Sequence, residues 1–568
     1  MVTPVGRTDR GMALLLMAAL AVPLGWSAWA ALRGAFDLAA WQSVWADTQT
    51  WRAVQLTLFT GVLASGLAMA LAAWLLSHHF PGRRWPALVR ALGPLLAVPH
   101  AAFAIGLAFL IAPSGWLLRA VSPWATGLDA PPPWSTTQDP WGLGLILVLV
   151  AKEVPFLLWT AATQLQRADV AATLQRELQV ARSLGYAPQA AWWRVLWPQL
   201  WPRLRWPLMA VLAYNLTVVD MALVIGPTSP PTLAVLAWQG LLDADVARNA
   251  QGTAAAWLLA ALVVGVAALG WPVTRLPLWR ARWTSGTRGR SRYVTRYAKV
   301  SANGLGPFGR LGWWALLGVY LAVMLALAVG SVSGFWPFPS LLPQTWTGAA
   351  WASVGQSLDT VGTTLTLATA SAVTALAWSV AWLECAPSRW IEPMRRLIYL
   401  PLLLPPVLWV VGVHGMALTW GIDATWTGVW LAHTLSALPY VLIALSPAYT
   451  GFDPRFRQLC ASLGHGRWAF LWRVKWPLLR TALTAALAIG FAVSVAQYLP
   501  TLFVGAGRLG TVTTEAVTLA AGAQRSLTAA YAWLQWLLPM WVFAGAAWLG
   551  QARRFQAKPA PSNSPQGE

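Results

Sequence analysis

Two ionisable residues, Lys152 and Glu153, stand next to each other inside a long apolar stretch of the sequence. A charged group within a membrane-spanning segment is costly and is a functional hypothesis by default. Neighbouring residues of a helix point about 100° apart, so the two groups need not pair with each other. We interpret them either as part of a gate or solute path, or as a structural network with neighbouring helices.

A second polar group lies in a later apolar stretch and contains Asn215, Thr217 and Asp220. The matching region of the other half of the chain carries Gln497 and Tyr498 instead. A carboxylate inside a membrane span is a functional hypothesis by default, so these residues are candidates for a translocation path that differs between the two halves. A purely structural role is the alternative.

The sequence shows no constellation for catalysis or metal binding. His100, His414 and His433 each stand alone, and we interpret each as a core histidine with satisfied hydrogen bonds. No nucleophile stands near a base, and no His/Cys cluster has the spacing of metal ligands. We therefore expect no catalytic residue, no metal and no cofactor, which argues against a membrane-embedded enzyme.

A pattern of basic and tryptophan residues occurs twice, at a constant offset of 279 residues in a chain of 568. In the first copy Gly185 is followed by a segment that ends at Pro198; in the second, Gly464 is followed by one that ends at Pro477. Glycine adopts a positive φ readily. Each copy is thus predicted to form a helix, a glycine turn and a second helix, with the proline where the chain turns into the next span. Gly226 with Gly505 and Thr232 with Thr511 match at the same offset. Upstream, Pro99 and Gly106 match Pro405 and Gly412, with the same spacing of seven residues, and the first half carries extra residues between these and the loop.

The tryptophans of each copy recur every fourth residue. They are Trp193, Trp197 and Trp201 in the first copy and Trp468, Trp472 and Trp476 in the second. This spacing places the indoles on one helix face. Indoles prefer the level of the lipid headgroups, so this helix is predicted to lie along the inner membrane surface. A single copy could be explained as a plain membrane-surface anchor. Two copies with the same spacing favour a functional role for the loop over that interpretation.

The composition is that of a polytopic membrane protein. The chain is 57% hydrophobic and 10% charged, where a soluble domain has about 25% charged residues. Its mean hydropathy is +0.55. A spanning helix needs roughly 20 apolar residues, and twelve segments qualify, which predicts an all-α fold of two six-helix repeats that enter the membrane in the same direction. The segments are 11–32, 56–76, 93–113, 141–162, 207–226 and 253–273, then 311–332, 360–383, 397–419, 426–448, 482–504 and 527–549.

The basic residues orient these spans. With the N-terminus inside, few of the 39 Lys and Arg residues fall outside; those that do are Arg33, Arg52, Arg119, Arg248, Arg508 and Arg525. This bias places both repeated loops and both termini in the cytoplasm. The net charge of +21 then reflects topology and not a nucleic-acid partner. We expect a first transmembrane half at 1–273, a basic linker at 274–310 that is either solvated or in contact with membrane lipid, a second transmembrane half at 311–552 and a disordered tail at 553–568.

The repeated loop resembles the EAA motif of ABC-importer permeases, which reads Glu-Ala-Ala, three residues, Gly, nine residues, Ile, any residue, Leu-Pro. The first copy supplies Gln179, Ala181, Gly185, Val195 and Pro198 at these positions. The second copy supplies Gln458, Cys460, Gly464, Val474 and Pro477. Both copies carry Gln for Glu and Trp for Leu, which puts a salt bridge to a partner in doubt but leaves a hydrogen bond. The resemblance implies a helix that seats in a groove on a cytoplasmic ATPase.

The whole chain is similar to the fused double permeases of binding-protein-dependent importers, of the iron(III) and thiamine types. Stretches at 98–104, 152–156, 496–501 and 513–517 make it most similar to the Ynj-type fused permeases. The resemblance implies the MetI-like type I fold, a bacterial inner membrane location, a pair of ATPase subunits and a periplasmic solute-binding protein. None of the four lysines follows a glycine, so the GxxxxGK[ST] phosphate loop is absent and ATP hydrolysis is expected on a separate subunit.

A secondary active transporter with a 6+6 parallel repeat is the alternative. That class carries its cytoplasmic signature between the second and third spans. Here the corresponding segment 77–92 contains His78-His79 and Arg83-Arg84 but no acidic residue, and 384–396 does not repeat it. The long loop between the fourth and fifth spans is also unexpected for that class, so the ABC permease is the favoured interpretation.

Overall fold

The computed structural model describes residues 7–551 except 83, 187, 276–306 and 523. Over these residues the secondary structure is helical, and two isolated β-bridges, Thr228–Pro231 and Ser333–Trp346, are the only β pairing in the described part. The all-α fold is therefore confirmed. The predicted linker falls almost wholly outside the described residues, and the predicted tail falls wholly outside them.

The helices of the first half, in chain order, are α1 (Arg7–Gly34), α2 (Leu38–Ala46), α3 (Thr48–His79), α4 (Trp85–Ala97), α5 (His100–Ile111), α6 (Trp116–Val121), α7 (Leu143–Leu165), α8 (Ala168–Ser183), α9 (Pro188–Ala191), the π-helix η1 (Trp192–Leu196), α10 (Trp197–Thr217), α11 (Asp220–Ile225), α12 (Leu233–Leu242) and α13 (Val246–Arg275). Those of the second half are α16 (Pro307–Ser331), α17 (Ala349–Gln356), α18 (Leu358–Cys385), α19 (Ser388–Ile398), α20 (Leu400–Leu403), α21 (Pro406–Trp420), α22 (Trp426–Thr450), α23 (Arg455–Ser462), α24 (Arg467–Phe470), the π-helix η2 (Leu471–Lys475), α25 (Trp476–Val495), α26 (Leu499–Gly505), α27 (Val512–Ala520) and α28 (Arg525–Gln551).

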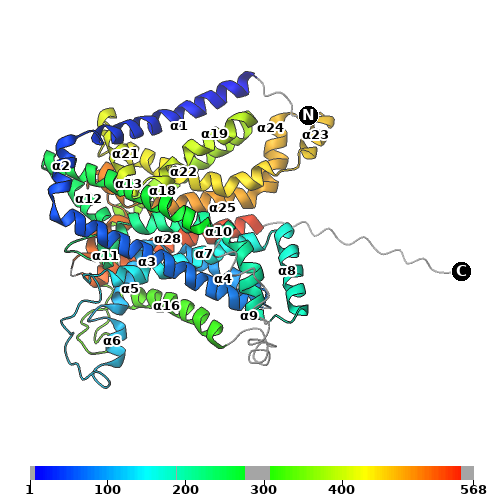
Figure 1. The fold of residues 1–568 in the computed structure, drawn as a ribbon. Helices are drawn as coiled ribbons and strands as arrows, with labels where there is room; N and C mark the ends of the chain where they lie inside the picture. The colour runs from blue at the N-terminus through cyan, green and yellow to red at the C-terminus, as the bar shows by residue number, and fades with distance from the viewer. Residues whose placement is uncertain (1–6, 83, 187, 276–306, 523, 552–568) are drawn as a thin grey trace.

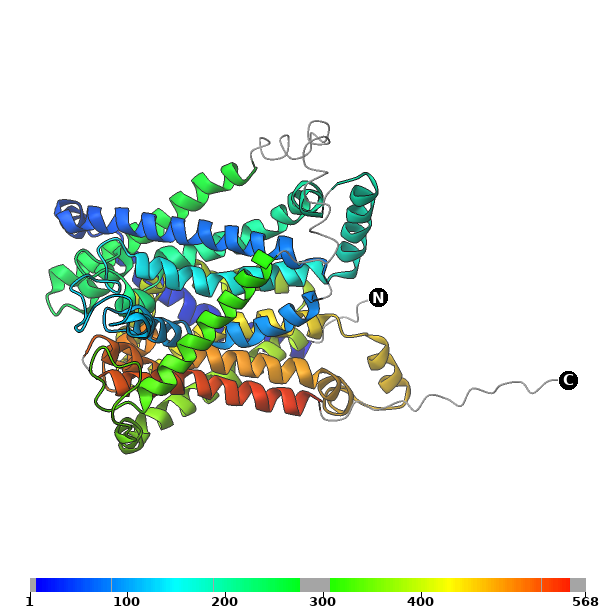
Figure 2. The same cartoon turned by 90° about the horizontal axis from the view of Figure 1, so that it is seen from below.

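Ten helical runs of the described part are long and apolar enough to cross a membrane. Figures 1 and 2 show them aligned along one direction as a single bundle. The other two of the twelve predicted spans, 207–226 and 397–419, are present in a different form. The first is divided between α10 and α11, and the second contributes the 15-residue helix α21. Pro405 and Pro406 set the start of α21, because proline has no N–H to continue a helix from the preceding turn.

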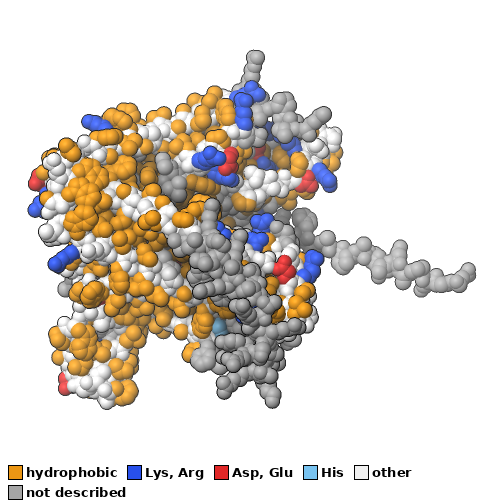
Figure 3. All heavy atoms as spheres, viewed as in Figure 1, with side chains coloured by type: hydrophobic (Ala, Val, Ile, Leu, Met, Phe, Trp, Pro, Cys, Tyr) orange, Lys and Arg blue, Asp and Glu red, His pale blue; other side chains and the backbone are white. Residues whose placement is uncertain are grey.

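The two halves repeat the same order of helices. α3, α7, α10 and α13 of the first half correspond to α18, α22, α25 and α28 of the second, and the corresponding pairs contact one another in the same combinations. Both repeated loops, with α8 and α23, lie at one end of the bundle, and α6 lies at the other (Figures 1 and 2). In Figure 3 the visible face is mostly hydrophobic, and Lys and Arg gather mainly toward the end with the two loops, here called the loop end.

The first helix of each half crosses to the other half. α1 packs on α21 and α18, and α16 packs on α5 and α3. The matched glycines make these crossings possible. A Cβ added at Gly412 of α21 would lie 2.4 Å from the backbone oxygen of Ser27, and one at Gly106 of α5 would lie 2.8 Å from that of Val323. Close backbone approach at glycine is a common device of membrane helix pairs.

We predict that Gly412→Ala lowers the thermal stability of the purified protein in detergent. The added methyl group meets a backbone oxygen that cannot rotate away, so α1 must shift, at a cost on the order of 1–3 kcal/mol. Gly318→Ala in α16 is the matched control, because no atom lies within 4 Å of an added Cβ there. Equal melting temperatures for the two variants would contradict the proposed role of Gly412 in the crossing.

Candidate functional site: two repeated loops and a polar centre

The two repeated loops share one backbone conformation. We call residues 168–198 loop A and residues 455–477 loop B. In loop A, Gly185 has φ +85°, its N–H donates to the oxygen of Arg182, and the N–H of Tyr186 donates to that of Ala181. In loop B, Gly464 has φ +76° and the two bonds recur at equivalent residues. This pair of bonds is the Schellman motif that ends a helix at a left-handed residue.

Steric crowding does not explain why these two positions carry glycine. A Cβ added at Gly185 or at Gly464 would have no atom within 4 Å. The requirement is therefore conformational, because a positive φ is strained for most side chains and far less so for glycine or asparagine. The predicted order of helix, glycine turn and helix is present in both copies.

The prolines do not interrupt the helix that follows the turn. The chain is helical from Pro188 to Thr217, and the five residues before α10 form the π-helix η1. The N–H of Trp197 bonds to the oxygen of Trp192, five residues back. Loop B repeats this with η2 before Pro477. Proline crowds the carbonyl four residues before it and donates no bond, and a widened π turn accommodates both effects.

The predicted tryptophan stack forms in loop A. Ring centroids of Trp193 and Trp197 lie 5.5 Å apart, and those of Trp197 and Trp201 lie 5.7 Å apart. In loop B, Trp472 and Trp476 are 4.5 Å apart, while Trp468 is 70% exposed. The stack thus packs against its own half in loop A and is more open in loop B. That it lies along a membrane surface stays a prediction.

Each loop also exposes an apolar pair beside its glycine turn. Val180 and Leu184 are 58% and 57% exposed in loop A, and Leu459 and Leu463 are 59% and 66% exposed in loop B. The pairs are offset by the same 279 residues as the motif, which is the signal that could have singled them out from sequence. The two loops therefore leave an apolar pair open to solvent at equivalent places.

The motif residues divide between this surface and the interior. Gln179 and Gln458 are exposed, whereas Ala181 is buried in the core. The side chains of Val195, Pro198 and Val474 are half-buried, and Pro477 is exposed. Glu177 is half-buried and accepts a hydrogen bond from Gln199, so it fastens α8 to α10 within loop A.

Loop B is fastened differently, by charges. Arg467 forms an ion pair with Asp9 of α1 and donates to the backbone oxygen of Glu384 at 3.1 Å. Lys475 forms an ion pair with the same Glu384, and its ammonium lies 3.9 Å from the ring centre of Tyr449. The Tyr449 hydroxyl donates to Glu384 at 2.6 Å. In the first half, Gln189 donates a hydrogen bond to the backbone oxygen of Ser77 at 3.3 Å.

Lys152 is buried and has partners of its own. Its ammonium donates to the backbone oxygen of Val98 at 2.7 Å and lies 5.7 Å from the ring centres of Phe103 and Tyr320. Glu153 is 5% exposed and makes no hydrogen bond to any described residue. The two neighbours are thus used separately, as their position on a helix suggested. Lys152 ties α7 to the segment before α5, which is the structural network weighed as its alternative role.

Three of the predicted path residues lie at two breaks in the helices. Asp220 is the first residue of α11, directly after the break from α10, and Gln497 and Tyr498 lie in the break between α25 and α26. Asp220 is within electrostatic reach of Tyr498 and of Tyr214, and Glu153 is within reach of Tyr214. Asn215 stands apart from this group, because its amide donates to Ser65 at 3.0 Å. His433 is satisfied at both ring nitrogens, by Ser494 and Thr501.

Comparison with known proteins places this architecture in a family. The chain is 33% identical over 548 residues to the inner membrane ABC transporter permease protein YnjC of Escherichia coli K12. The matched region covers 95% of this chain and 96% of that protein. Shorter matches are to a probable molybdenum ABC transporter permease protein of Haloferax volcanii, 31% identical over 24% of this chain and 54% of that protein, and to the molybdenum transport system permease protein ModB of Azotobacter vinelandii, 27% identical over 32% and 86%. No protein-family model matches the chain.

The chain therefore belongs to the ABC transporter permease family and is a multi-pass inner-membrane protein. Its relatives are permease subunits and not enzymes. The secondary-transporter alternative loses its support, because the match runs over nearly the whole length of both chains.

We predict that Glu384→Gln destabilises the protein by on the order of 3 kcal/mol, because it leaves the half-buried Lys475 without its carboxylate. Thermal unfolding in detergent measures the change. Glu392→Gln is the control, because the Glu392–Arg395 pair is about half exposed and such pairs contribute about 0–1 kcal/mol. The same shift in both variants would show that the charges around loop B do not fasten it.

Proposed function

We propose that this chain is the membrane-spanning subunit of an ABC importer, and that loops A and B are its two docking sites for separate ATPase subunits. The observation that carries the proposal is the pair of loops itself. They share backbone conformation, lie at the same end of the bundle and expose matching apolar pairs beside the same glycine turn. Two near-equivalent surfaces suit two copies of one partner.

We expect apolar contacts to contribute most to docking and polar contacts to contribute less. Val180 and Leu184, with Leu459 and Leu463, supply apolar surface that would be buried on binding. Gln179 and Gln458 are exposed on the same helices and can donate or accept hydrogen bonds without a charge. The family's glutamate position thus keeps a polar contact while losing an ion pair. Ala181, Val195 and Val474 would hold the loop against the membrane helices.

From this assignment we infer the remaining partners and the orientation. The loop end would face the cytoplasm together with both termini, in agreement with the distribution of Lys and Arg. A periplasmic solute-binding protein would then deliver solute to the opposite end, where α6 lies. ATP hydrolysis would take place on the docked subunits, because this chain has no phosphate-binding loop of the GxxxxGK[ST] type.

We also propose that the solute passes the two helix breaks. A break in a membrane helix leaves backbone groups unsatisfied, and such breaks are tolerated where they line a cavity or a binding site. Asp220 at one break and Gln497 and Tyr498 at the other give this path different chemistry on its two sides. We place Glu153 on the path because its carboxylate makes no hydrogen bond to any residue that the structure describes, whereas Lys152 holds α7 to the segment before α5.

We predict that Gly185→Val with Gly464→Val removes the ATPase from the purified complex. Valine cannot adopt the positive φ without strain, so both turns distort. The measurement is Mg-ATP hydrolysis that copurifies with the tagged chain from its native membranes, with the subunit identified by mass spectrometry. Gly185→Asn with Gly464→Asn is the matched control and is expected to keep the activity, because asparagine tolerates a left-handed backbone. If the double valine variant kept wild-type activity, the turns would not be part of the docking site.

We predict that Leu184→Ser with Leu463→Ser weakens ATPase binding at least tenfold without changing thermal stability. Both side chains are more than half exposed, so their loss costs little in the free protein and removes apolar contact only in the complex. Leu341→Ser with Leu342→Ser is the control at the opposite end, where the exposure is similar. Equal ATPase retention by both double variants would place the docking surface elsewhere.

A further inference from the structure

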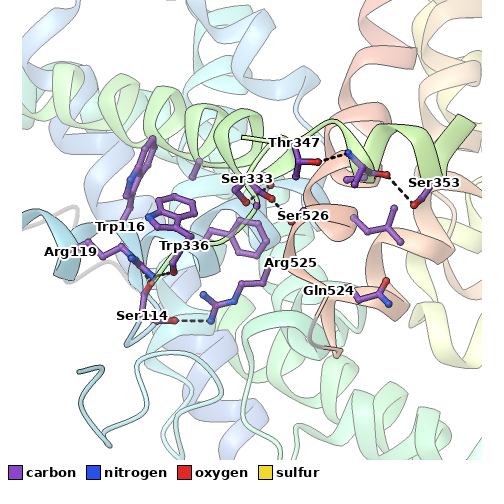
Figure 4. A pocket seen from close by; sticks show the side chains of 17 residues that line it. Ser114, Trp116, Arg119, Ser333, Trp336, Thr347, Ser353, Gln524, Arg525 and Ser526 are labelled. Atoms are coloured by element: carbon purple, nitrogen blue, oxygen red, sulfur yellow. Dashed lines mark hydrogen bonds between the residues drawn. The ribbon is translucent and has the colours of Figure 1, made fainter. Parts of the chain in front are cut away.

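A cavity of about 540 Å³ opens at the end of the bundle opposite the loops. Its walls come from both halves, since the end of α5 and the start of α6 face the end of α16, the start of α17 and the start of α28 (Figure 4). The volume lies within the range of about 300–1,000 Å³ that is usual for small-ligand sites. No aspartate or glutamate lines it, whereas two arginines, Arg119 and Arg525, do.

Arg119 builds the wall and is not available to a ligand. It is 6% exposed, and its guanidinium donates to the backbone oxygens of Ser114, Trp336, Pro337 and Ser340. The Trp336 ring centre lies 5.0 Å from it. Its positive charge is therefore held in place by carbonyl groups, and no carboxylate pairs with it among the residues that the structure describes. A buried charge in a protein is normally paired with an opposite charge. Because Arg119 lacks such a partner in the described part of the chain, the net charge around it is positive.

Arg525 adds a second positive charge to the same place. Its Nη2 donates to the hydroxyl of Ser114 at 2.7 Å, while Arg119 donates to the backbone oxygen of that residue. The two guanidinium groups lie within electrostatic reach of each other. The other N–H groups of Arg525 have no partner among the residues that the structure describes. Gln524 lines the cavity beside it and contributes an amide (Figure 4).

We propose that this cavity binds a phosphate-type anion through Arg525, and that the anion is the headgroup phosphate of a phospholipid. The anion would balance two like charges that the protein leaves uncompensated. The lipid source is favoured by the walls, because the membrane-crossing stretches of α16 and α28 are only 33% and 17% buried and present large apolar side chains such as Leu321 and Trp541. A headgroup between these two helices would place its acyl chains along their exposed faces.

The first half has an arginine at a comparable place, and this arginine lies beside a carboxylate. Arg248 stands near the start of α13, the counterpart of α28, and is 69% exposed. It has its own carboxylate, Asp243, at 3.9 Å. Both arginines lie on the side of the membrane where basic residues are few. Arg248 lies beside a carboxylate, whereas Arg525, which is also exposed, has none among the residues that the structure describes, so Arg248 is the matched control.

The test uses the purified full-length chain in dodecyl maltoside, a detergent without a phosphate group. Short-chain phosphatidylglycerol, short-chain phosphatidylcholine and inorganic phosphate are titrated at constant ionic strength, and the thermal midpoint gives the apparent Kd. Wild type and Arg248→Gln are expected to bind phosphatidylglycerol equally. Arg525→Gln is expected to bind about tenfold more weakly, which is the effect of losing one charge-assisted hydrogen bond.

The other arms separate the sources of the anion. Binding of phosphatidylglycerol that inorganic phosphate does not compete with supports a lipid site. Saturation by inorganic phosphate alone, lost in Arg525→Gln, supports the anion site and overturns its lipid occupant. Equal binding of every probe by wild type and Arg525→Gln overturns the proposal. None of these outcomes bears on ATPase docking, which takes place at the opposite end.

Discussion

The loop end of this protein depends on two backbone reversals, at Gly185 and Gly464. Each reversal ends one helix and starts another, and each satisfies the last carbonyls of α8 or α23 through the same pair of hydrogen bonds. The exposed apolar pairs, the glutamines and the π turns all take their positions from these two residues. Because nothing crowds either glycine, the constraint is purely the sign of φ.

Around this common frame the two halves are fastened in different ways. Loop A is held by tryptophan packing and by the hydrogen bond that Gln199 donates to the Glu177 carboxylate. Loop B is held by ion pairs that reach α1, a helix of the other half. The crossing of α1 and α16 through Gly412 and Gly106 makes the halves mutually dependent. A movement of loop B would therefore act on the first half as well as on its own.

Much of this could be predicted from the sequence, because apolar length and matched spacing are local signals. The all-α fold, the repeat and the glycine turns follow directly from them. The breaks before Asp220 and Tyr498 could not be predicted, since both lie in stretches apolar enough for continuous spans. The partners of Lys152 and Arg467 could not be predicted either, because they lie far away in the sequence. Lys152 contacts Val98, and Arg467 contacts Asp9 and Glu384. The glycine pair at 106 and 412 was visible as a match, but its meaning needed the crossing helices.

The central claim is that one chain carries two ATPase docking sites. Native mass spectrometry of the complex purified from its own membranes tests it most directly, because it weighs the assembly without a known solute. We expect an assembly of one 61.4-kDa chain with two ATP-binding subunits. An assembly in which the chain carries no ATP-binding subunit, or only one at saturating ATPase, would contradict it.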